Sequence, residues 1–304
     1  MKWEKKGLVF GVHQNSDWMD NSALTPTPLL IGDKIRIFVG FRDRYGVGRV
    51  GYVDVDANNP SEVLQVSQKP CLDIGEPGCF DDNGVVPCAV VMQNEKLYLF
   101  YAGYNVGYHV RMTIFSGLAI SQDFGETFKR ASRVPIMERT DRSPLFRVVH
   151  TALKDNGSWK IYYGEGEKFI QGQKKTLPVY NISLLETENL TELDKDGETV
   201  LAAEGNEYRV GRPYVVKDRG IYKMFFGGGS EEITYRLAYA ESLDGKQWKR
   251  IDSKLNMNLS SSGWDSEMTA YPAFVRYRDK AYLFYNGNNY GWDGFGYAEL
   301  VDED

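Results

Sequence analysis

Two carboxylates, Asp82 and Glu267, occupy equivalent places in a chain of 304 residues that repeats itself. Asp82 lies five residues before Pro87, Glu267 lies five residues before Pro272, and each proline begins a hydrophobic run. Two carboxylates that face one another across a concave site can cleave a glycosidic bond, because one protonates the leaving oxygen while the other activates water or stabilises the oxocarbenium-like centre. The alternative is that each carboxylate caps or anchors the loop in which it lies.

The position directly before the same repeat point carries three side chains suited to contact a substrate. His150, Arg212 and Tyr271 occupy it in the third, fourth and fifth repeats. An imidazole and a phenol exchange hydrogen bonds with hydroxyl groups, and a guanidinium fork binds anionic oxygens. We expect these residues to orient the substrate or to bind an anionic part of it.

Four further residues are assigned to substrate binding. Arg147 lies near His150 in the chain, and Glu165 follows the second strand of the third repeat. Trp264 and Trp292 are expected to act as platforms, because the CH groups of a sugar face pack on an aromatic ring. The alternatives are a solvated loop position for Glu165 and packing between sheets for the aromatic residues.

A cluster of basic residues favours a second kind of chemistry. The guanidinium forks of arginines suit phosphate oxygens, which predicts transfer to phosphate or from a phosphorylated donor. The cluster consists of Arg142, Arg147, His150, Arg209 and Arg212. The alternative is that these arginines neutralise Asp81, Asp82 and Glu207.

Five repeated segments must position all of these residues. Each reads as a hydrophobic strand, a turn and a second, aromatic strand, and the repeat points are Pro28, Pro87, Thr151, Pro213 and Pro272, spaced by 59, 64, 62 and 59 residues. A fixed period of this size indicates a radial or stacked array, and short strands between turns indicate propeller blades. The first strand of each blade lines the axis, so residues at its start are expected to converge at one mouth.

Further strands complete the predicted blades. A third strand follows each pair, and Asp-Gly turns near residues 123 and 244, which resemble Asp-box turns, predict a fourth. The fifth repeat ends without a fourth strand, whereas residues 2–6 match the outer-strand sequence at 247–250. We therefore predict an all-β, five-bladed β-propeller, a single domain over residues 1–304, whose last blade is closed by the N-terminal strand.

Composition excludes several classes of function. The net charge is −6 with both signs interspersed, so no basic stripe for nucleic acid is expected. No run approaches the roughly 20 apolar residues of a membrane span, and no leader peptide is recognised. The 3 cysteines form no metal or redox motif, and their low count fits a reducing cytoplasm. No metal, cofactor or membrane is therefore expected, and the oligomeric state stays open.

Several stretches of the chain carry a resemblance to known proteins. They are 25–30, 41–43, 78–87, 117–121, 211–213, 263–272, 283–291 and 294–296. With these, the chain resembles five-bladed propellers of the arabinanase, levansucrase and invertase type, a group that includes glycoside hydrolase families 32, 43, 62 and 68 and the mannoside phosphorylases of family 130. It is most similar to bacterial glycosidase-like propellers often encoded with surface-polysaccharide genes.

The resemblance implies a glycan-processing enzyme that acts on a small sugar, glycoside or activated sugar used in surface-polysaccharide synthesis. It also implies carboxylates on the first three blades. Five residues before the repeat point, these blades here hold Ala23, Asp82 and Phe146. These departures leave two alternatives open. One is a glycoside phosphorylase or phospho-sugar transferase, and the other is a non-catalytic carbohydrate-binding propeller.

Overall fold

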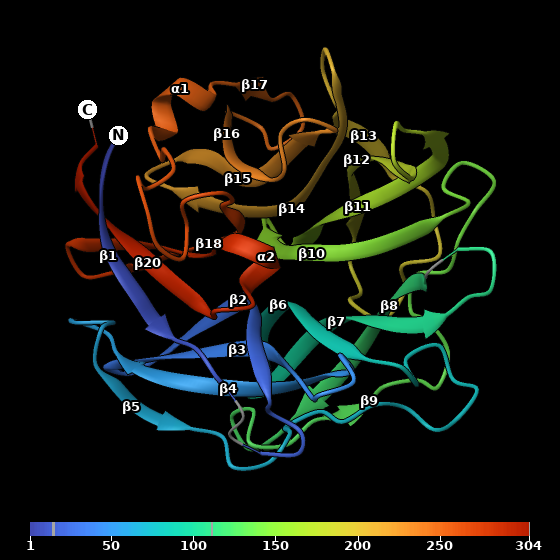
Figure 1. Cartoon of the computed structure of the whole chain (residues 1–304), viewed down its shortest axis with the longest axis horizontal. Coiled ribbons are helices and arrows are strands. Elements are labelled where there is room, and N and C mark those ends of the chain that lie inside the picture. The colour runs from blue at the N-terminus through green and yellow to red at the C-terminus, as the bar shows by residue number, and fades with distance from the viewer. Residues whose placement is uncertain (14–15, 111, 304) are drawn as a thin grey trace.

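The chain folds as a five-bladed β-propeller, as the repeats predict. The computed structural model describes residues 1–13, 16–110 and 112–303, and within them twenty strands and two four-residue helices form. The strands form sheets arranged radially, and the first strand of each sheet lies near the centre of the view in Figure 1. The all-β class is therefore confirmed.

Each blade consists of four antiparallel strands that follow one another outward from the axis, and blades three and four are also joined into one sheet. Blade one is β2 (Asn21–Ile31), β3 (Lys34–Arg42), β4 (Gly48–Asp56) and β5 (Val63–Val66), and blade two is β6 (Val85–Gln93), β7 (Lys96–Val106), β8 (Met112–Ser121) and β9 (Lys129–Arg130). Blade three consists of β10 (Phe146–Asp155), β11 (Ser158–Gln171), β12 (Thr176–Thr187) and β13 (Glu198–Leu201). Blade four consists of β14 (Glu207–Asp218), β15 (Ile221–Ser230), β16 (Arg236–Ser242) and β17 (Lys249–Arg250). Blade five is β18 (Ala270–Tyr277), β19 (Lys280–Asn286), β20 (Phe295–Asp302) and β1 (Lys2–Phe10), while α1 (Asp252–Leu255) and α2 (Asn288–Gly291) lie between strands.

The N-terminal strand closes the last blade, as predicted. β1 pairs antiparallel with β20, and the two chain ends lie side by side in Figure 1. Trp3 on β1 is only 9% exposed, and its ring meets Phe225 and Phe274 edge to face at centroid distances of 6.3 and 6.4 Å. Closure gives β20 a hydrogen-bonded neighbour on its outer side, and β1 becomes the outer strand of the blade.

The hydrophobic core consists of layers between neighbouring blades. Phe38 of blade one, for example, packs with Leu99 of blade two, and Phe225 of blade four packs with Leu283 of blade five. Similar layers join blades two and three, three and four, and five and one. Each sheet therefore buries both faces, which explains why apolar and polar residues alternate only partially along its strands.

In both turns predicted to resemble Asp boxes, the aspartate carboxylate accepts backbone N–H groups. Asp244 accepts the N–H groups of Gln247 and Lys246, both at 2.8 Å, and Asp123 accepts the N–H of Thr127 at 3.0 Å. These backbone donors favour the charged carboxylate and lower the pKa of Asp244 to about 2. Each turn leads into the outer strand of its blade, β9 or β17.

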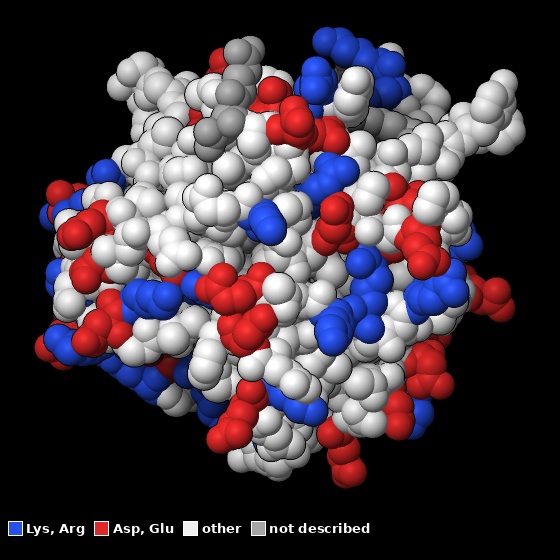
Figure 2. Space-filling model, turned by 90° about the horizontal axis from the view of Figure 1, so that it is seen from below, with Lys and Arg blue, Asp and Glu red and all other residues white. Residues whose placement is uncertain are grey.

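Charges of both signs are intermixed on the surface. The face shown in Figure 2 carries lysine and arginine among aspartate and glutamate, without a continuous basic band. Among the described residues, no helix is long and apolar enough to cross a membrane.

Replacing Trp3 with alanine should destabilise the protein by about 3 kcal/mol, because a buried aromatic ring leaves a cavity between blades four and five. Denaturant unfolding of Trp3→Ala beside the wild type measures the loss. Leu8→Ala is the matched control, because Leu8 lies on the same strand but is 45% exposed; its change should stay within about 0.5 kcal/mol. Equal stability of Trp3→Ala and the wild type would contradict the role of β1 in closure.

Candidate functional site

All five inner strands carry a β-bulge near the repeat point. The strand register breaks between Leu24 and Thr27, Pro87 and Ala89, Val149 and Thr151, Gly211 and Tyr214, and Ala270 and Ala273. In three of these bulges the extra residues include one with left-handed backbone, namely Thr25, Arg212 and Tyr271, each at φ 56°. A bulge interrupts the alternation of side chains along a strand and turns one of them in a new direction.

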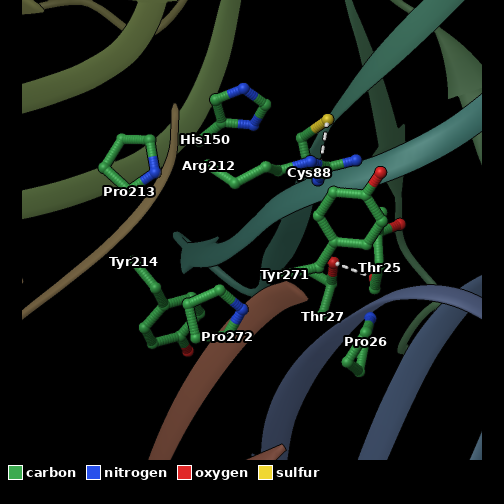
Figure 3. A pocket seen from close by; sticks show the side chains of 10 residues that line it. All are labelled: Thr25, Pro26, Thr27, Cys88, His150, Arg212, Pro213, Tyr214, Tyr271 and Pro272. Atoms are coloured by element: carbon green, nitrogen blue, oxygen red, sulfur yellow. Dashed lines mark hydrogen bonds between the residues drawn. The ribbon is translucent and has the colours of Figure 1, made fainter. Parts of the chain in front are cut away.

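The bulges together form a ring of side chains on the axis. One residue from each blade contributes: Thr25, Cys88, His150, Arg212 and Tyr271, called here the axial ring. With neighbouring threonine, proline and tyrosine residues they line a cavity of about 10 Å³ (Figure 3). This volume holds about one water molecule, so the cavity itself is too small for a sugar-sized ligand.

Arg212 carries the charge of the axial ring. Its Nη1 donates to the carbonyl of Pro87 at 3.2 Å and to the Sγ of Cys88 at 3.5 Å, and its guanidinium lies 5.0 Å from the centre of the Tyr271 ring. Within the described chain it forms no ion pair. Burial raises the pKa values of the Cys88 thiol and the Tyr271 hydroxyl, so both stay neutral at pH 7.

His150 faces the axis as a neutral imidazole. It is 9% exposed, and its Nδ1 has no hydrogen-bond partner among the described residues. Burial and the neighbouring charge of Arg212 both hold its pKa well below the ordinary 6.5, since each disfavours the cation. The ring thus combines a fixed cation with a neutral imidazole that can donate or accept one further hydrogen bond.

The predicted carboxylates lie in loops that precede inner strands. The carboxylate of Asp82 accepts the N–H of Gly78 at 2.8 Å and the Nδ2 of Asn105 at 3.0 Å, which are the contacts of a loop cap. Glu267 is exposed and its main chain is held by Asn288 and Arg236, while its carboxylate has no partner among residues 1–13, 16–110 and 112–303. A catalytic role for either residue stays a prediction.

Two other predicted residues belong to a separate polar cluster in blade three. The Glu165 carboxylate accepts hydrogen bonds from Ser143 at 2.9 Å and Thr199 at 2.8 Å, and it is 6% exposed. Arg147 is 1% exposed, and its Nη1 donates to the carbonyl of Glu138 at 3.0 Å. Neither residue lines the axial cavity, so the structure does not bring them together with the axial ring.

The two tryptophans differ in their surroundings. The Trp264 ring stacks on Tyr285 with centroids 4.9 Å apart, which is a packing contact inside blade five. Trp292 is 47% exposed, and its carbonyl accepts the N–H of Ser22 at 3.2 Å, beside the start of β2. Trp292 therefore keeps a free surface that could support a sugar, whereas Trp264 mainly stabilises the blade.

Sequence reasoning missed Thr25 and Cys88 in the axial ring and Tyr180 and Tyr235 beside it. The available signal was the proline inside four of the five hydrophobic runs, because a proline in a central strand usually marks a bulge. The bulge direction itself could not be deduced from the sequence. No group of three or more His, Cys, Asp and Glu side chains that could hold a metal occurs in the part of the chain that the structure describes.

Comparison with known proteins gives relatives in sequence and similar solved structures. The Mycobacterium tuberculosis protein Rv1502, described as uncharacterized, is 30% identical over 302 residues and 99% of both chains. A structure from the GH130 family of mannoside phosphorylases, which contains glycoside hydrolases that target β-1,2 mannosidic linkages in Candida mannan, superposes with a TM-score of 0.73 at 14% identity, over 100% of this chain and 94% of that one. A thermostable family-43 glycoside hydrolase gives 0.70 at 17% identity, over 95% and 93%.

These similarities support the fold that the sequence predicted. The structures share the five-bladed propeller over nearly the whole chain, so the predicted resemblance to family 43 and family 130 propellers is confirmed. No family model matches the chain.

The depressed pKa of His150 predicts a pH-dependent difference in stability. Below pH 6.5 the unfolded chain binds a proton at this residue while the folded protein does not, so folding stability falls as the pH decreases. His150→Gln removes this effect, and between pH 7.5 and 5.5 the wild type should lose about 1 kcal/mol more than the variant. Denaturant unfolding at both pH values measures the difference. Parallel losses in the two proteins would show that His150 titrates normally.

Proposed function

The chain belongs to the family of the uncharacterized Mycobacterium tuberculosis protein Rv1502, and we propose that it is a glycan-processing enzyme that acts at the mouth of the propeller axis. Its substrate is a small sugar, glycoside or activated sugar. The observation that carries this proposal is the axial ring, in which five bulges bring one side chain from each blade to a single point. A fold shared with glycoside hydrolases and family 130 phosphorylases supports it.

The axial ring forms the floor of the proposed binding site. Its cavity is too small for a sugar, so the substrate lies on the ring and contacts Arg212, His150 and Tyr271 from the mouth. Arg212 and His150 supply directed hydrogen bonds, and the Tyr271 ring offers a flat apolar surface for sugar CH groups. A few polar groups in an aromatic surround are typical of small-molecule sites.

The acid–base chemistry is assigned to Asp82 and Glu267. The donors Gly78 and Asn105 hold the Asp82 carboxylate in one place, and a fixed carboxylate can serve as a general base. Glu267 precedes the inner strand of blade five and keeps a free carboxylate, which suits the partner role. One protonates the leaving oxygen while the other activates water or stabilises the sugar cation.

A second candidate function is carbohydrate binding without catalysis. The observation in its favour is that the axial ring contains no carboxylate and that both oxygens of Asp82 already accept loop donors. The two functions differ in one measurable property. An enzyme converts a bound sugar, whereas a binding protein releases it unchanged.

A ligand screen followed by a turnover assay tests the proposed function. Thermal shifts are measured with nucleotide sugars, sugar phosphates and neutral oligosaccharides, and each ligand that stabilises the protein is then incubated with it and analysed for products. Products that need the folded protein support the enzyme. Binding without conversion at any pH, with or without phosphate, would favour the carbohydrate-binding propeller.

Asp82→Asn should lower turnover about 100-fold, because the amide cannot exchange a proton with the substrate. Glu267→Gln should cause a similar loss and, being exposed, should leave the melting temperature unchanged. The control is Glu95→Gln, which removes an exposed carboxylate from the turn at the other end of β6 and should leave turnover unchanged. Near wild-type turnover in a folded Asp82→Asn protein would remove Asp82 from the mechanism and leave it the role of a loop cap.

A further inference from the structure

A buried arginine near the axial ring lacks a carboxylate partner. Arg209 on β14 is 9% exposed, and its Nε has no hydrogen-bond partner in the described part of the chain. Its guanidinium lies 4.0 Å from the centre of the Tyr235 ring and 4.8 Å from that of Tyr208. A buried cation normally pairs with an anion, since removing its hydration is costly.

The backbone gives this arginine space to lie at the seam of blades three and four. Arg209 pairs with Tyr180 in the single parallel contact that joins these blades. Gly229, the partner of Arg209 on β15, leaves room for the arginine side chain. Any larger residue at this position would place its Cβ 3.0 Å from the Arg209 Nε. The Tyr180 and Tyr235 hydroxyls are hydrogen-bonded to each other. A cage of tyrosines thus covers most of Arg209 and leaves 9% of its surface open to solvent.

This cage is continuous with the axial ring. The Tyr235 ring that covers Arg209 lies 5.8 Å from the Tyr271 ring, and Tyr271 in turn lies 5.0 Å from the Arg212 guanidinium. Tyr290, which is 38% exposed, borders the same group at 6.1 Å from Tyr235. Two cations without ion pairs and several tyrosines therefore share one side of the mouth.

The neighbouring carboxylates do not neutralise these cations. Glu207 pairs with Arg250 at 2.7 Å, and Asp81 pairs with Arg130 at 2.7 Å. The suggestion that Arg209 and Arg212 neutralise such residues is therefore wrong for Glu207 and Asp81. If Arg209 and Arg212 are to be paired, the negative charge must come from outside the described part of the chain.

We propose that Arg209 and Arg212 form a subsite for an oxyanion of the substrate, a carboxylate or a phosphate. This rests on the proposed function and narrows its substrate to an anionic sugar, either a uronate or a sugar phosphate. The guanidinium groups supply charge-assisted hydrogen bonds, and a bound oxyanion supplies the countercharge that burial requires. The tyrosine rings beside them pack against the sugar faces.

Calorimetric titration with matched probes tests the subsite. The probes are inorganic phosphate, glucose 1-phosphate, glucuronate and neutral glucose. We expect at least one anionic probe to bind the wild type at millimolar concentration or below, and more tightly than glucose. Arg209→Gln and Arg212→Gln should each weaken that binding about tenfold or more, because each removes a charge-assisted bond.

The control variant is Arg219→Gln. Arg219 lies in the turn at the other end of β14 and pairs with Glu303. The variant therefore removes one positive charge from the same blade, but far from Arg209 and Arg212 along the strand. Its affinity for the anionic probe should equal that of the wild type. Arg212→Gln carries the test if Arg209→Gln does not fold, because Arg212 is partly exposed.

The outcomes separate the subsite from the proposed function. Preference for phosphate and glucose 1-phosphate identifies a phosphate subsite, and preference for glucuronate identifies a carboxylate subsite. Absence of anion binding, or equal binding by the wild type and both glutamine variants, overturns the subsite; turnover of a neutral sugar would then leave the proposed function standing. Arginine-dependent anion binding without turnover of any sugar would keep the subsite and remove the enzyme.

Discussion

Closure of the ring of blades is the constraint on which the rest of the structure depends. Five inner strands can meet at one axis only if the first and last blades are joined, and β1 makes this joint by pairing with β20. A second link lies at the axis itself, where buried Asn286 of blade five accepts the N–H of Thr25 at 2.6 Å and donates to the carbonyl of Ala23 at 2.8 Å. The same asparagine thus stabilises the closed ring and fixes the bulge of blade one.

The bulges convert this scaffold into a candidate site. In a regular inner strand, successive side chains point into the two layers between blades. None of them points across the sheet toward the axis. An extra residue breaks that alternation, and here it does so in all five inner strands at the same level. His150 and Arg212 line the same axial cavity for this reason, although 62 residues separate their repeat points.

Charge is distributed unequally between the blades and the mouth. Several buried or half-buried arginines of the blades have carboxylate partners, such as Arg36 with Asp54 at 2.7 Å and Arg250 with Glu207 at 2.7 Å. Arg209 and Arg212 face tyrosine rings instead. Ion pairs inside a blade lower the cost of burying charge, whereas unpaired cations at a mouth keep their attraction for an anion from solution.

The sequence determined the five blades, their strand order and the closing role of residues 2–6, because each rests on a repeated local pattern of apolar strands and turns. It also predicted that His150, Arg212 and Tyr271 converge, since their place before the repeat point is the same in each blade, and all three line the axial cavity. Only the tertiary structure decided that Arg147 and Glu165 belong to a separate cluster and that Cys88 and Thr25 complete the ring. Direction and pairing of these side chains depend on bulges and on contacts between blades, which join residues far apart in the chain and leave no local pattern.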